Sequence, residues 1–166
     1  VMRLEELISD TENAVYRKIL ENRDISEEEA RKTSETVGLA AIKYGDLSNQ
    51  ASKDYVFDLD RFTAFEGNTG PYILYTIVRI KSIIKRYSSE STDAFTADDI
   101  LPYNSLSEKK LELELVRYNE VMENAWHELA PHKICQYIYG VAEAFNSFSF
   151  KLLLIESSFE LYKLLR

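Results

Sequence analysis

The sequence predicts an all-α protein, in which a helical connector over residues 1–65 leads into an α-helical bundle over residues 66–166. Only five glycines and three prolines occur among 166 residues, and 29% of the residues are charged, which is typical of compact helical proteins. Apolar residues recur every three or four positions along most of the chain, the spacing of one helix face. Ser, Thr and Asp residues stand just before several of these segments, where helix N-caps occur.

Two long helices are predicted in the connector. Residues 3–21 carry apolar side chains at helical spacing and form the first. Ser26 and Glu29 form a Ser-x-x-Glu capping box, which opens a second helix that continues through Ile42. Gly45 and the following Asp46 are expected to close it.

The end of the connector is shorter and more irregular. Residues 54–57 are aromatic and β-branched, so they predict a short extended, strand-like segment. Asp58 is the expected N-cap of a short helix that carries Leu59, Phe62 and Phe65 on its apolar side.

A sharp bend separates the connector from the bundle. Gly67, Asn68 and Gly70 tolerate positive φ, and Thr69 is the expected N-cap of the helix that follows. Pro71 suits the first position of that helix, where its missing N–H costs nothing. A bend this defined predicts a junction between two packed units. The candidate junction residues are Glu66, Asn68, Pro71, Tyr72 and Tyr75.

The bundle is predicted to contain helices separated by short polar connections. A helix over residues 72–87 is followed by a turn-rich connection over residues 88–102. Ser107 is the expected cap of a helix over residues 108–118, and Asn119 the expected cap of the next helix, which runs to Leu129. Pro131 begins a helix to about residue 148, and residues 151–165, apolar on nearly every side, form a buried final helix.

Composition limits the classes of function. No apolar run approaches the roughly 20 residues that a membrane span needs. The single cysteine, Cys135, excludes an internal disulfide and fits a reducing compartment, and two histidines provide no metal-ligand spacing. No phosphate-binding glycine motif and no Ser/His/Asp constellation is present.

The net charge of −8 argues by itself against a nucleic-acid binder. The charges, however, are segregated along the chain. Acidic residues gather at positions 27–29, 98–99 and 108–128, whereas basic residues gather at positions 79–86. Binding a polyanion requires a local positive face, not a positive total.

Two long motifs carry a resemblance to a known family. The first is the run VGLAAIKYGDLSNQASKDYVFDLDRFTAFEGNTGPYILYTIVRIKSI over residues 37–83. The second consists of LAPHKI at residues 129–134, YIY at 137–139 and AFNSF at 144–148. In this order they resemble the end of the catalytic part of arginyl-tRNA synthetases and the helical anticodon-binding domain that follows it. The resemblance covers about residues 3–148.

The resemblance implies that the whole enzyme joins arginine to its tRNA, using ATP with Mg and releasing AMP and pyrophosphate in the cytoplasm. The expected partners are tRNA(Arg) and the upstream catalytic domain of the same enzyme, with no membrane and no DNA. The family's HIGH-like and KMSKS-like ATP-site signatures do not occur here, so we expect no catalytic residue, no metal and no cofactor in this chain, which we expect to begin mid-protein.

This chain's own role would then be to bind the anticodon stem-loop. Single-stranded RNA loops are bound by aromatic stacking, base-edge hydrogen bonds and basic groups on phosphates. Asn146 and Ser149 are expected near a helix end with side chains free to meet bases, and His132 is expected to contact either RNA or a backbone carbonyl. The candidate tRNA-binding residues are Arg79, Lys81, Lys85, Arg86, His132, Lys133, Asn146 and Ser149.

Structural roles for these residues, and a different class of function, remain open alternatives. The basic residues of 79–86 would equally serve as a solvated face that offsets a helix dipole. Tyr139 and Phe145 are expected to be core residues, and Trp126 is expected to be in the core or half-buried. The family's usual loop after AFNSF is missing, so residues between about 148 and 150 are expected to be omitted from this sequence. A different class of function is a non-catalytic helical protein-interaction module that uses the acidic face of residues 108–128.

Overall fold

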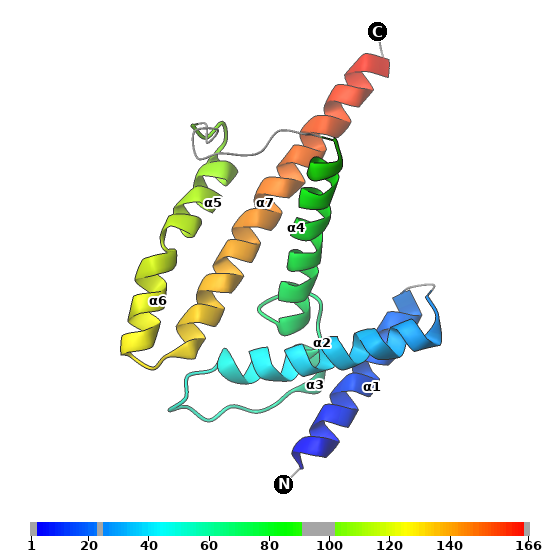
Figure 1. Ribbon diagram of the computed structural model, residues 1–166, viewed down its shortest axis with the longest axis vertical. Coiled ribbons are helices and arrows are strands. Elements are labelled where there is room, and N and C mark those ends of the chain that lie inside the picture. Colours follow the sequence, from blue (N-terminus) through cyan, green and yellow to red (C-terminus); the bar gives the residue numbers. More distant parts are fainter. Residues whose placement is uncertain (1–2, 23–24, 91–101, 165–166) are drawn as a thin grey trace.

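The computed structural model describes residues 3–22, 25–90 and 102–164, and within them all regular secondary structure is helical. Figure 1 shows a helical hairpin, α1 and α2, that crosses one end of a flat layer formed by α4, α7 and the α5–α6 pair. The all-α prediction is therefore confirmed. The helices are α1 (Leu4–Asn22), α2 (Glu27–Leu47), α3 (Leu59–Phe62), α4 (Gly70–Glu90), α5 (Leu106–Val116), α6 (Tyr118–His127) and α7 (Pro131–Leu164).

The hairpin contains a small apolar core between α1 and α2. Val15 is fully buried, and Ile19, Ala30 and Val37 join it from the two helices. The predicted capping residue Ser26 accepts a hydrogen bond from the backbone N–H of Glu29. Helix α2 thus begins where the capping box places it.

The segment after α2 differs in two ways from its prediction. Gly45 does not end α2, which continues to Leu47. This glycine instead provides room for the ring of Phe62. Residues 54–57 form no strand; instead Phe57 stacks on Phe62 with ring centroids 4.5 Å apart. Asp58 caps α3 as predicted, but the helix stops at Phe62.

The bend before α4 forms as predicted, although its glycines have different roles. Gly67 takes a positive φ of 74°. Gly70 does not, and it is required instead because a Cβ there would lie 2.4 Å from the carbonyl oxygen of Ala40. The Thr69 hydroxyl accepts from the Tyr72 N–H and donates to the Ala64 carbonyl, so it ties α4 to the preceding turn.

Two predicted caps in the bundle are wrong. Ser105, not Ser107, is the N-cap of α5 and accepts from the N–H of Glu108. Ser107 lies buried in the first turn, 3.0 Å from the Ser105 hydroxyl. Asn119 lies inside α6, which follows α5 after the single residue Arg117 and has no side-chain cap.

Helix α7 begins at Pro131 as predicted but runs without interruption to Leu164. The predicted break near residues 149–150 is wrong, because no proline or glycine interrupts the sequence there. The expected burial of residues 151–165 and the expected connection over residues 91–101 lie outside what the structure describes.

Candidate nucleic-acid interface

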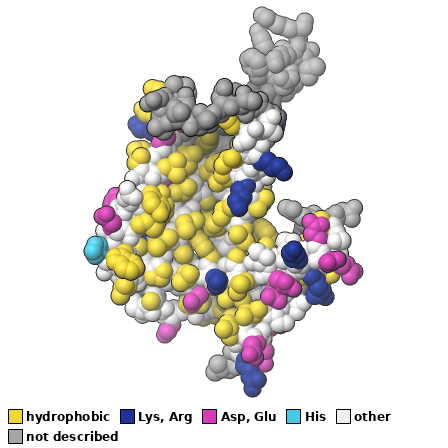
Figure 2. Space-filling view, viewed as in Figure 1, with side chains coloured by type: hydrophobic (Ala, Val, Ile, Leu, Met, Phe, Trp, Pro, Cys, Tyr) yellow, Lys and Arg dark blue, Asp and Glu magenta, His cyan; other side chains and the backbone are white. Residues whose placement is uncertain are grey.

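Helix α4 is the most cationic element of the layer. Residues 70–89 contain four basic side chains and no carboxylate. Lys81, Lys85 and Arg86 are exposed, and Arg79 is half-buried. Figure 2 shows basic side chains at the edge of the layer where α4 lies, beside a broad apolar area. The four basic residues therefore lie on one helix, and the tRNA contacts predicted for them stay a prediction.

Asn146 does not have the free side chain that the sequence analysis expected. It lies inside α7, and its amide nitrogen donates to the Tyr72 hydroxyl at 2.8 Å and to the Thr76 hydroxyl at 3.1 Å. Its carbonyl oxygen accepts from the Arg79 guanidinium at 3.3 Å. Asn146 thus joins α4 to α7 and orients Arg79.

Ser149 also lacks the exposed side chain that its expected role requires. Only 4% of it is exposed, and its hydroxyl donates to the backbone carbonyl oxygen of Asn146. Both residues were expected near a helix end, where α7 was predicted to break. In the continuous helix, Asn146 faces α4 and Ser149 is buried.

The two predicted contacts at the start of α7 are less available than expected. Lys133 forms an ion pair with Glu128 at 2.5 Å. Nδ1 of His132 is buried and has no hydrogen-bond partner among the described residues, so this nitrogen forms neither of the expected contacts.

The aromatic candidates separate into buried and exposed residues. Tyr72 donates to Glu143 at 2.5 Å, and burial together with that carboxylate raises the pKa of its hydroxyl. Tyr75, a predicted junction residue, is instead 47% exposed on the outer side of α4. Trp126, expected in the core or half-buried, is 77% exposed, whereas Tyr139 and Phe145 are half-buried.

Where α2, the bend and α7 meet, the central residue is Tyr44, which was not among the predicted junction residues. The Tyr44 hydroxyl, on α2, lies 2.6 Å from Oδ1 of Asn68 in the bend and 2.8 Å from the carbonyl oxygen of Cys135 on α7. Burial raises the pKa of this hydroxyl. Pro71 is fully buried, while Glu66 is exposed. No residue pattern marked Tyr44, since its two partners are 24 and 91 positions away.

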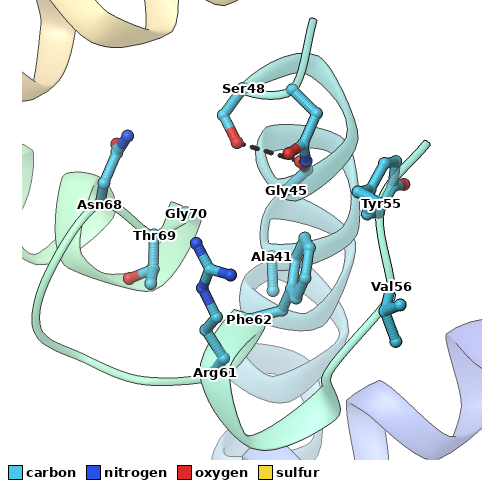
Figure 3. A pocket seen from close by; sticks show the side chains of 11 residues that line it. Ala41, Gly45, Ser48, Tyr55, Val56, Arg61, Phe62, Asn68, Thr69 and Gly70 are labelled. Atoms are coloured by element: carbon cyan, nitrogen blue, oxygen red, sulfur yellow. Dashed lines mark hydrogen bonds between the residues drawn. The ribbon is translucent and has the colours of Figure 1, made fainter. Parts of the chain in front are cut away.

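A pocket of about 380 Å³ opens beside this junction. Figure 3 shows that Arg61 extends toward Thr69 and Gly70, while Phe62 lies against the α2 side. Within the described ranges, no group of three or more His, Cys, Asp or Glu residues could hold a metal ion. The same part of the chain contains no helix long and apolar enough to cross a membrane.

Comparison with known families matches two successive parts of the chain. Residues 1–59 match the family described as "tRNA synthetases class I (R), catalytic domain". Residues 73–161, more than half of the chain, match the "DALR anticodon binding domain". The division falls close to the predicted boundary at residue 65.

Curated relatives and solved structures agree with this division. The chain is 55% identical over 155 residues to an arginine–tRNA ligase of Agathobacter rectalis and 54% identical over 148 residues to one of Alkaliphilus oremlandii; each alignment covers 89% of this chain. The chain spans about a quarter of the length of these relatives, 26% and 25%. It also superposes on the arginyl-tRNA synthetase of Plasmodium falciparum with a TM-score of 0.71 and 27% identity, covering 91% of this chain and 27% of that one. The chain belongs to the arginyl-tRNA synthetase family, of which it carries the end of the catalytic domain and the DALR anticodon-binding domain.

Proposed function

We propose that this chain holds the anticodon arm of tRNA(Arg) for an arginine–tRNA ligase. The observation that carries the proposal is the position of the four cations of α4 within the matched anticodon-binding domain, on a stretch of helix without carboxylates. Such a stretch attracts phosphates locally, although the whole chain is acidic.

Exposure assigns roles to the individual residues. Lys81, Lys85 and Arg86 contact phosphates, and the exposed ring of Tyr75 stacks on a base of the loop. Arg79 extends the positive face while its bond to Asn146 fixes its direction. We assign Asn146 and Ser149 to the support of this face, and we keep His132 and Lys133, at the start of α7, as candidate contacts outside it.

The whole enzyme is proposed to join arginine to tRNA(Arg) with ATP, releasing AMP and pyrophosphate. We propose that ATP and Mg²⁺ bind in the upstream part of the same enzyme's catalytic domain, which is this chain's second proposed partner. A tRNA partner and the single cysteine favour the cytoplasm.

The test compares the full-length parent enzyme with two variants in a filter-binding assay. We expect the anticodon hairpin of tRNA(Arg) to bind at low salt and the double variant Lys81→Glu/Lys85→Glu to weaken that binding at least about tenfold, because two attractive charges become repulsive. Lys32→Glu, an exposed change on α2, is the control. Equal binding by the parent and the double variant would contradict the assignment of α4.

A further inference from the structure

Two successive family domains meet in this chain, and one hydroxyl group touches both of them. Tyr44 lies within the part that matches the catalytic domain, and Cys135 lies within the anticodon-binding domain. Asn68 belongs to the bend between the two matched parts. The Tyr44 hydroxyl is within hydrogen-bond distance of both, at 2.6 Å from Asn68 and 2.8 Å from Cys135.

The surrounding contacts permit little adjustment at this point. The backbone at Gly70 lies against the Ala40 carbonyl so closely that even a methyl group would not fit. Pro71 is fully buried beside it. On the other side of the bend, Lys18 of α1 donates to the Thr63 hydroxyl at 2.8 Å. The bend is thus fixed to the hairpin at two points, and α2 also packs against α4, whereas α2 and α7 touch over only a small area.

We propose that Tyr44 is a positioning residue that sets the angle between the catalytic and anticodon-binding parts of the enzyme. The Tyr44 hydroxyl, on α2, lies within hydrogen-bond distance of the Asn68 amide oxygen in the bend and of the Cys135 carbonyl oxygen on α7, and its one proton is donated to one of these two acceptors at a time. Figure 1 shows α2 crossing the end of the layer that contains α7. Without the hydroxyl, the small α2–α7 contact is held by packing alone.

The consequence for function rests on the proposed binding of tRNA. When a ligase holds an RNA at one end and reacts with the other end, its rate depends on the distance between the two sites. Misplacement by about 1 Å far from the chemistry can lower a rate about 100-fold. A residue that fixes the angle between the parts therefore affects a long substrate that spans both of them. It leaves unaffected a short substrate that meets only the catalytic part.

The first test measures the angle directly and needs no RNA. Spin labels are attached at Glu28 on α2 and Ser147 on α7, both exposed, in a full-length enzyme whose other exposed cysteines are replaced. We expect Tyr44→Phe to broaden the distribution of distances between the labels. Tyr118→Phe removes a hydroxyl from a 55% exposed ring on α6 and serves as the control. Asn68→Ala is expected to broaden the distribution less, and it provides a second variant if Tyr44→Phe folds poorly.

The second test compares aminoacylation of full-length tRNA with that of a hairpin containing only the acceptor stem. Tyr44→Phe is expected to lower kcat/KM about tenfold for the tRNA and to leave the hairpin unchanged, whereas a general loss of folded enzyme lowers both. An unchanged label distribution in both Tyr44→Phe and Asn68→Ala overturns the positioning role. A broadened distribution in an enzyme that binds no anticodon hairpin supports that role and rejects the proposed function.

Discussion

At the scale of single residues, two glycines in helices differ in the space that surrounds them. A Cβ on Gly45 would lie 1.8 Å from the Phe62 ring, whereas a Cβ on Gly140 would lie 3.6 Å from its nearest neighbour, the Glu114 carboxylate. We expect Gly45→Ala to lower the free energy of unfolding by about 1–3 kcal/mol through overpacking. Gly140→Ala should raise it by about 0.5–1 kcal/mol, because alanine loses less backbone entropy in a helix. Urea titrations of the two variants measure the difference, and a stabilised Gly45→Ala would contradict the packing described.

Local chemistry made several residues predictable. Ser26, Asp58 and the Thr69–Pro71 pair mark helix starts by bonds that span only three residues, so the sequence alone reveals them. Burial is different, because it depends on which element arrives from elsewhere. Trp126 was expected in the core or half-buried, yet it is 77% exposed on α6.

At the scale of elements, the start of α5 shows how two similar residues compete for one role. Ser105 accepts from the Glu108 N–H, whereas the hydroxyl of Ser107 meets only Ser105. We expect Ser105→Ala to destabilise the chain by about 1 kcal/mol and Ser105→Asp to retain most of the stability, since aspartate also caps helices. Thermal unfolding followed by circular dichroism measures both. Ser105→Asp as unstable as Ser105→Ala would show that the cap is not the cause.

Two candidate site residues were wrongly placed because α7 is longer than predicted. One helix was predicted to end at about residue 148 and another to begin at residue 151, but the sequence around Ser149 contains no helix breaker, so the helix continues. Asn146 consequently lies within a helix and joins α4 to α7. The grouping of the four cations of α4, in contrast, was predictable because all four lie in one uninterrupted helix.

The contact between α2 and α7 predicts a response to alkaline pH. Burial, with Cys135 and Tyr139 close by, raises the pKa of the Tyr44 hydroxyl above its ordinary value of about 10. Because the unfolded chain loses this proton first, the contribution of Tyr44 to stability is complete below about pH 10 and declines as the pH rises further. The difference in free energy of unfolding between the parent and Tyr44→Phe should therefore be constant from about pH 7 to 9 and shrink above about pH 10. Urea titrations at four pH values measure it, and a difference that grows above pH 10 would exclude a protonated donor.

At the scale of the whole molecule, the layer of α4, α7 and α5–α6 is open on the flat side that Figure 2 shows. Tyr75, Val78 and Ile84 of α4 and Leu113 of α5 are exposed, and Figure 2 shows a continuous apolar area over the layer. Stacking of unpaired bases uses surfaces of this kind, with cations beside them for the phosphates. An acidic protein can thus bind RNA if its positive charges lie on one edge of such a layer, as those of α4 do.

The salt dependence of binding tests whether the four α4 cations account for the electrostatic attraction. Each phosphate neutralised in single-stranded RNA contributes about −0.7 to the slope of log K against log salt, so four cations predict a slope no steeper than about −3. We expect Lys81→Gln/Lys85→Gln to reduce its magnitude by about 1 to 1.5, because two of the four contacts are lost. Lys32→Gln, on the exposed side of α2, should leave the slope unchanged although it alters the net charge of −8. Filter binding of the anticodon hairpin over a salt series measures all three proteins. If Lys32→Gln reduced the slope as much as the removal of one α4 lysine, the total charge rather than the edge of the layer would govern binding.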